Sequence, residues 1–226
     1  MQSQKSLLPF IEVNPTTAPI GTVILLHGLG ADGNDFVPFV KELHLPANLP
    51  LRFVFPNAPT RPVTINNGYV MPAWYDILSM NIDQRADQTG LIESVHALNH
   101  LIENEIKLGT PADKIILAGF SQGAVVALTT ALRHAERLAG VLVLSGYLPN
   151  AQELATDASS ANRTTPIFMA HGTQDPVIPF NVGQAAFEVL KKAEFAISWH
   201  SYAMAHSVCE KEAQDIATWL KRIYLA

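Results

Sequence analysis

The sequence has almost no cysteine and no long apolar run. Cys209 is the only cysteine, which rules out an internal disulfide framework and fits a reducing compartment. Residues 1–10 lack the apolar stretch of a secretion signal, and no other run approaches the length of a membrane span. We therefore expect a cytoplasmic protein that does not span a membrane.

Charge is also scarce and evenly spread. Charged residues make up 15% of the chain, and the net charge of -5 is not gathered into acidic or basic blocks. Nucleic acid and anionic lipid are therefore not expected as partners. No His, Cys and Asp residues stand at metal-ligand spacing, so no metal is expected. With 226 residues, 48% of them hydrophobic, and no repeat, the chain is expected to fold as one domain over 1–226.

Short apolar segments alternate with segments of helical periodicity. The alternation predicts an α/β fold whose central sheet is mostly parallel and flanked by helices, with functional loops at the carboxyl ends of the strands. Residues 56–80 are too irregular for a strand and are predicted as a long loop, and residues 150–165 as a polar excursion with little burial. The expected strands are 22–26, 51–55, 115–118, 140–146, 167–170 and 196–202, and the expected helices are 35–43, 91–106, 124–132, 182–192 and 207–223.

Ser121 stands between an apolar strand and a helix, in the sequence Gly-Phe-Ser-Gln-Gly. This G-x-S-x-G pattern in a strand–turn–helix context is typical of a nucleophile elbow. Gly119 and Gly123 remove the side chains that would collide where the chain doubles back, and Ser121 itself must tolerate a strained backbone. The pattern predicts a nucleophilic serine.

A rival signal is the G-x-G-x-x-G pattern of Gly28, Gly30 and Gly33, which follows a strand and precedes a helix. It would fit a nucleotide-binding oxidoreductase, but the acidic residue that should follow the next strand for the ribose is absent. The same glycines suit a loop that directs a backbone N–H at the carbonyl attacked by Ser121. The hydrolase interpretation is favoured, and the oxidoreductase remains the alternative.

A serine nucleophile requires an imidazole base and a carboxylate to orient it, in the chain order Ser, acid, His. Asp175 follows directly on an apolar strand, although an aspartate before a proline is also a common turn residue. His206 stands in the loop between the last strand and the last helix, whereas His200 lies within the strand pattern. We therefore expect Ser121, Asp175 and His206 to form a triad.

The predicted loop at 56–80 carries apolar side chains that are unusual for a segment facing water. We expect Met71, Trp74, Ile77 and Leu78, with Met80, to line an acyl-binding groove beside Ser121. The alternatives are that they pack on the core or form a homodimer contact.

The chain resembles the small carboxylesterases and acyl-protein thioesterases, the phospholipase/carboxylesterase family of the α/β-hydrolase fold. The likeness covers nearly the whole length. It departs from the family at Ala124, where many relatives have glycine, and the polar stretch 150–165 does not match the family pattern. It implies a single-domain α/β-hydrolase without a large lid domain, a Ser121–His206–Asp175 triad, and oxyanion donors from the backbone N–H groups of Leu29 and Gln122. The motifs are HGLGADG at 27–33, PNAPTRPVT at 56–64, WYD at 74–76, GFSQG at 119–123, LSGYLP at 144–149, HGTQDPVIP at 171–179 and HSVC at 206–209.

The resemblance implies hydrolysis of acyl esters or thioesters through an acyl-enzyme, without a cofactor. The substrate would be an acylated protein, a lysophospholipid or a small ester. A catalytically silent hydrolase-fold binding protein is a further alternative, which the intact set of Ser121, Asp175 and His206 disfavours.

Overall fold

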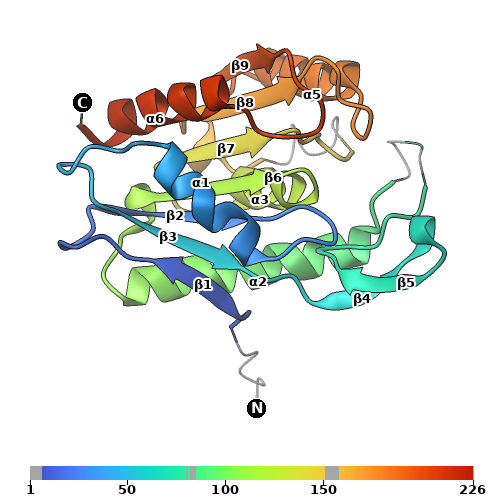
Figure 1. The fold of residues 1–226 in the computed structure, drawn as a ribbon, viewed down its shortest axis with the longest axis horizontal. Coiled ribbons are helices and arrows are strands. Elements are labelled where there is room, and N and C mark those ends of the chain that lie inside the picture. The colour runs from blue at the N-terminus through green and yellow to red at the C-terminus, as the bar shows by residue number, and fades with distance from the viewer. Residues whose placement is uncertain (1–6, 80, 82–84, 151–157, 226) are drawn as a thin grey trace.

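A sheet of seven strands runs through the molecule, and helices cover both of its faces (Figure 1). The computed structural model describes residues 7–79, 81, 85–150 and 158–225. The strand order is β1-β3-β2-β6-β7-β8-β9, and every neighbouring pair is parallel except β1 with β3. The strands are β1 (Phe10–Val13), β2 (Gly21–Leu26), β3 (Leu51–Pro56), β6 (Ile115–Phe120), β7 (Gly140–Leu144), β8 (Ile167–Gly172) and β9 (Ile197–Tyr202).

The helices form two layers. Helices α1 (Val37–Glu42) and α6 (Glu210–Leu225) cover one face, and α2 (Gln88–Lys107), α3 (Gln122–Arg133) and α5 (Phe180–Lys192) cover the other (Figure 1). Residues of β2 alternate between the two cores: Val23 packs in the α1–α6 layer and Ile24 in the α2–α3 layer. Strands covered on both faces are apolar throughout, which is why they stood out in the sequence. The part of the chain that the structure describes also contains the short 3-10 helices η1 (Gly33–Phe36), η2 (Thr64–Asn66), η4 (Ala112–Lys114) and η5 (Ser160–Asn162).

The predicted α/β fold is confirmed, and the strand β1 is an addition that the sequence analysis did not anticipate. β1 pairs antiparallel with β3 at the edge of the sheet, with Phe10 opposite Pro56. It has only four residues and, as an edge strand, pairs with a neighbour on one side only, so its apolar pattern is weak. The expected helix at 35–43 begins as the 3-10 turn η1 before it becomes α1.

The prediction that residues 56–80 form a loop without strands is wrong. Strands β4 (Thr60–Val63) and β5 (Tyr69–Pro72) pair antiparallel in a separate ribbon. Asn67 and Gly68 turn the chain between them with positive φ angles of 56° and 75°. Prolines inside this stretch argued against a strand, but Pro62 lies in a two-stranded ribbon, where an unpaired edge tolerates a residue without an N–H.

The prediction of little burial for residues 150–165 is also wrong for part of the segment. Positions 151–157 lie outside the described residues, but Asn162 and Thr165 are buried. The Asn162 amide donates to the carbonyls of His134 and Glu136, at 3.0 and 2.9 Å, and accepts from the N–H of Leu138 at 2.9 Å. A polar side chain whose hydrogen bonds are all supplied internally can be buried at little cost, which composition does not reveal.

Candidate active site

Ser121 occupies a strained turn between β6 and α3. Its backbone angles are φ 54° and ψ -118°, outside the regions that an L-residue ordinarily adopts. The Ser121 N–H donates to the carbonyl of Leu144 at 2.8 Å, which ties the turn to the end of β7. The turn therefore holds the serine at the carboxyl edge of the parallel sheet, on a rigid scaffold.

The two glycines of the G-x-S-x-G pattern are required by space. A Cβ on Gly119 would lie well inside 3.0 Å of the Gly123 backbone, and one on Gly123 would be equally close to the carbonyl of Leu26. Any side chain would push α3 away from β6 or β2. This explains physically why the serine is flanked by glycine on each side.

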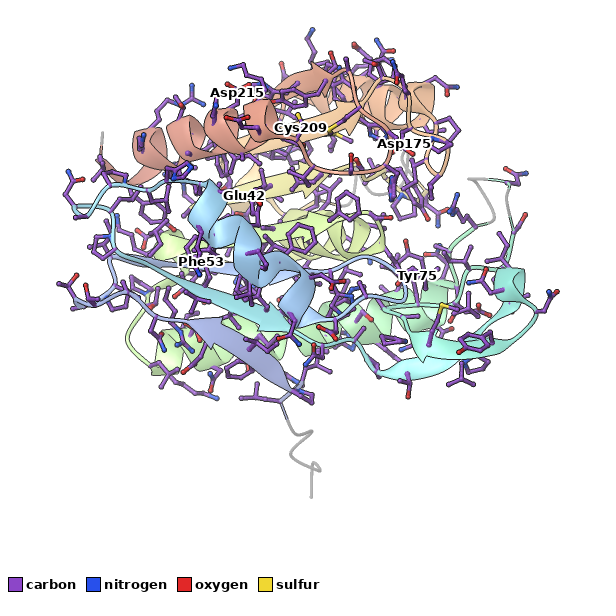
Figure 2. The ribbon with its side chains drawn as sticks, in the orientation of Figure 1. Glu42, Phe53, Tyr75, Asp175, Cys209 and Asp215 are labelled. Atoms are coloured by element: carbon purple, nitrogen blue, oxygen red, sulfur yellow. The ribbon has the colours of Figure 1, made fainter. Side chains whose placement is uncertain are left out.

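Asp175, labelled in Figure 2, and His206 come from the loops that follow β8 and β9, and their side chains meet at the same edge of the sheet. Asp175 Oδ2 accepts a hydrogen bond from His206 Nδ1 at 2.6 Å. Asp175 Oδ1 accepts from the N–H groups of Val177 and Ile178, at 2.8 and 2.9 Å. A carboxylate at Nδ1 keeps the proton on that nitrogen, so Nε2 of His206 is the nitrogen free to act as a base.

A second histidine supports this loop and was not assigned a role from the sequence. His171 is fully buried, and its Nε2 donates to the carbonyl of Ile178 at 2.8 Å. Nε2 also lies 3.4 Å from Asp175 Oδ2. Burial lowers the pKa of His171, which favours the neutral ring. The HGTQDP string, in which this histidine stands four residues before the aspartate, is the signal that could have identified it.

His200, the rejected candidate for the base, lies elsewhere. Its ring stacks on Phe168 with centroids 3.9 Å apart, and its Nε2 lies 3.1 Å from the hydroxyl of Ser198. Burial lowers the pKa of His200. It therefore packs as part of β9.

A cavity of about 520 Å³ opens beside Ser121. Ser121 and His206 both line it, together with Leu29 and residues of η1 and α1. Phe120 packs against the His206 ring with centroids 4.8 Å apart, which closes part of the wall. Figure 2 labels Glu42, the last residue of α1, on the side of the helix that faces the C-terminal half of the chain. The remaining lining residues are Gly28, Ala31, Asp35, Phe36, Pro38, Phe39, Glu42, Val177, Ser207 and Val208.

The four residues expected to form an acyl groove do not line this cavity. Trp74 and Ile77 are only 1% and 5% exposed and belong to the α2–α3 core, so the structure corrects their assignment to an open groove. Met71 is partly buried beside Gly30, and Leu78 is half exposed. Met80 lies outside the described residues. A segment of irregular backbone can be core when neighbouring elements satisfy its polar groups, as they do at Trp74.

Leu29 and Gln122, the expected oxyanion donors, come from two different segments next to the nucleophile. Leu29 lines the cavity from the loop that follows β2. Gln122 is the first residue of α3, so its N–H has no carbonyl one turn earlier in the helix to bond. The Gln122 side chain is buried and makes hydrogen bonds of its own.

The glycine-rich loop packs on the nucleophile. Gly28 lies against Phe120 and Ser121, and a side chain on Gly33 would collide with the carbonyl of Phe55. The Gly33 N–H donates to Asn57 Oδ1 at 2.8 Å. These contacts use the glycines for packing, which leaves the oxidoreductase alternative without structural support. Within the described residues, no group of three or more His, Cys, Asp and Glu could hold a metal ion.

The fold and the site are those of an α/β-hydrolase with a serine nucleophile. A model of the Phospholipase/Carboxylesterase family matches residues 10–224, so the chain belongs to this family. Acyl-protein thioesterase 1 of Yarrowia lipolytica is 38% identical over 218 residues, covering 94% of this chain and 96% of the relative. Acyl-protein thioesterase 1 of Candida albicans is 40% identical over 211 residues, covering 89% and 91%.

Solved structures show the same fold. Arabidopsis thaliana SOBER1 superposes with a TM-score of 0.84 at 32% identity, covering 90% of this chain and 98% of that one. Zea mays acyl-protein thioesterase 2 gives a TM-score of 0.85 at 28% identity, covering 96% and 99%. The chain is therefore a serine hydrolase of the esterase and thioesterase class. No helix in the described part of the chain is long and apolar enough to cross a membrane.

Proposed function

We propose that the protein hydrolyses acyl thioesters and esters through Ser121, His206 and Asp175. The observation that carries this proposal is the shared cavity: Ser121 and His206 both line it, and His206 Nδ1 is held by Asp175 at 2.6 Å. Ser121 Oγ attacks the acyl carbonyl while His206 Nε2 accepts its proton. The same imidazolium then protonates the leaving thiol or alcohol, and water cleaves the acyl-enzyme by the reverse sequence of proton transfers.

The backbone N–H groups of Leu29 and Gln122 stabilise the negative oxygen of the tetrahedral intermediate. Two observations support this role, because an oxyanion hole needs donors fixed close to the attacked carbonyl: Leu29 lines the same cavity as Ser121, and Gln122 directly follows Ser121 at the start of α3. The loop after β2 and the first turn of α3 each supply one donor, as the resemblance to the family implied.

The physiological substrate we propose is an S-acylated protein, as the names of the thioesterase relatives suggest. The apolar part of the substrate enters the cavity, whose apolar lining includes Phe36, Phe39, Phe120 and Val208. A lysophospholipid presents the same combination of an acyl chain and a carbonyl, and is a second substrate to test. We expect the reaction to take place in the cytoplasm, where S-acylated cysteines occur on proteins and where Cys209 stays reduced.

The test of the mechanism is covalent labelling of Ser121. A fluorophosphonate should label the wild-type protein on the peptide that contains Ser121, and Ser121→Ala should abolish labelling and lower kcat by roughly 10⁶. Labelling of another residue, or persistent turnover by Ser121→Ala, would contradict the assignment.

Competition among substrates decides the substrate class. Octanoyl-cysteine peptides, lysophosphatidylcholine and p-nitrophenyl octanoate should be compared by kcat/KM below micelle formation. We expect the peptide thioester to be preferred, and a preference for the lysophospholipid would assign the cavity to lipid. Homodimer formation stays a prediction, which light scattering of the purified protein tests.

A further inference from the structure

The side chain of Gln122 makes two hydrogen bonds that are separate from the role of its backbone N–H. Its amide is buried and joins two consecutive residues of the segment between β5 and α2. Oε1 accepts from the N–H of Trp74 at 2.8 Å, and Nε2 donates to the carbonyl of Tyr75 at 2.6 Å. A terminal amide supplies a donor and an acceptor together, whereas a carboxylate or an apolar side chain of similar size would leave at least one of these groups unpaired.

The same segment is bonded to the loop that carries Leu29. The Trp74 indole N–H donates to the carbonyl of His27 at 2.8 Å. The N–H of Gly30 donates to the carbonyl of Pro72 at 2.8 Å. These two bonds hold the chain before and after Leu29, so the position of its N–H depends on residues 72–74.

Three further hydrogen bonds hold this arrangement in place. Ser94 of α2 donates its hydroxyl proton to the carbonyl of Trp74. His27 accepts from the N–H of Ala58 through Nε2 at 3.1 Å, and its Nδ1 lies 2.7 Å from the carbonyl of Gly28, so the proton is on Nδ1. Burial lowers the pKa of His27, which agrees with a neutral ring that both donates and accepts.

We infer that the Gln122 side chain and the Trp74 indole are positioning residues that set the distance between the two oxyanion donors. The inference rests on the proposed function. Gln122 contributes its N–H to the oxyanion hole and its amide to Trp74 and Tyr75, and Trp74 in turn holds the loop of Leu29. The two donors lie far apart in the sequence, one in the loop after β2 and the other at the start of α3, and one continuous set of hydrogen bonds joins them. If the backbone N–H of Gln122 were its only contribution, removing the side chain would leave activity nearly unchanged.

The test is a matched pair of neutral substitutions. Gln122→Met keeps the approximate size of the side chain and removes both hydrogen bonds. Asn162→Leu does the same to the amide that bonds the backbone of His134, Glu136 and Leu138 away from the site. Each variant is measured for thermal unfolding, kcat, KM and the rate of inactivation by a fluorophosphonate.

We expect Gln122→Met to lower kcat by about 10- to 100-fold, because displacing a catalytic group by about 1 Å costs on the order of 10²-fold. The inactivation rate should fall in parallel, KM should stay within about threefold, and the midpoint of the pH–rate profile should not move, since His206 and Asp175 are untouched. Asn162→Leu should lower the unfolding temperature while kcat stays within about threefold.

Trp74→Phe removes the indole N–H and tests its hydrogen bond to the carbonyl of His27. We expect a fall in kcat of about 5- to 30-fold, and the double variant Gln122→Met/Trp74→Phe should be little worse than Gln122→Met, because both changes break one connection. If Gln122→Met does not fold, Trp74→Phe decides by itself.

The inference is overturned if the folded variants keep kcat within threefold of wild type, or if the loss is in KM or matches that of Asn162→Leu. A wild-type protein that is not labelled at Ser121 would instead overturn the proposed function, so the two failures are distinguishable.

Discussion

Two segments near the active site both carry aromatic and aliphatic side chains, but the structure uses them differently. Residues 72–78, which run from the end of β5 toward α2, bury Trp74 and Tyr75 in the α2–α3 core (Figure 2 labels Tyr75). Residues 33–42, which form η1 and α1, leave Phe36 half-buried on the wall of the cavity. The first segment is a support of the site, and the second is part of its surface.

The difference lies in where the backbone finds its hydrogen-bond partners. The irregular segment 72–78 bonds to Gln122, His27 and Ser94, all from other elements, and is thereby drawn into the core. Apart from the Gly33 N–H, which bonds Asn57, the segment 33–42 forms backbone hydrogen bonds within a 3-10 turn and a short helix, so it can remain at the surface. Apolar residues alone therefore do not identify the wall of a binding site.

Apart from loss of the nucleophile itself, the largest effect is expected at the Asp175–His206 pair. Asp175→Asn should leave the fold intact and lower kcat by roughly 10⁴, because the amide cannot hold His206 in the required tautomer. His200→Gln is the control and should stay within about tenfold of wild type. Steady-state kinetics with folded variants decides this, and an inactive His200→Gln beside an active His206→Gln would reverse the assignment.

Replacing one aromatic residue from each segment tests the comparison directly. Trp74→Ala should lower the free energy of unfolding by about 3–5 kcal/mol, because it empties a fully buried site and removes its hydrogen bonds. Phe36→Ala should cost about 1 kcal/mol or less. Urea denaturation measures both, and equal losses would mean that the two segments are equally part of the core.

The stability of the protein is expected to depend on pH through a buried carboxyl group in α6, the helix that follows Val208. Burial raises the pKa of Glu212 in α6 from 4.5 to about 8. The folded state then keeps this proton while the unfolded state releases it. The stability that the protonated Glu212 contributes is therefore fully present below pH 4.5 and is lost as the pH rises to about 8. Glu212→Gln should gain roughly 1–3 kcal/mol over wild type at pH 8 and little at pH 4.5.

Glu210→Gln changes an exposed carboxylate in the same turn and serves as the control. Thermal unfolding at several pH values compares the variants. The same pH slope in Glu212→Gln and wild type would show that Glu212 is charged in the folded protein.

The smallest effects concern the substrate chain. Each buried methylene should stabilise the bound transition state by up to about 0.8 kcal/mol until the cavity is full. The hexanoyl and octanoyl p-nitrophenyl esters should therefore have a higher kcat/KM than the acetyl ester. Phe36→Ala should flatten this dependence, whereas Leu78→Ser, on the exposed part of the first segment, should not. A flattening by Leu78→Ser alone would restore the groove first expected at residues 71–78.

Much of the fold and of the candidate site could be predicted from local patterns. The strands that are buried on both faces are continuously apolar, and the turn at Ser121 demands glycine at 119 and 123. Chain order and loop position were sufficient to select Asp175 and His206, which the structure places 2.6 Å apart. These features depend on residues close together in sequence, or on the rule that parallel strands end at one edge of a sheet.

Other features depend on partners far apart in sequence, and the tertiary structure alone decided them. The burial of Trp74 requires Gln122 and His27, 48 and 47 residues away along the chain. The burial of Asn162 requires the carbonyls of His134 and Glu136. A polar or irregular segment is stable in the core only when distant groups complete its hydrogen bonds, and local composition carries no record of which groups those are.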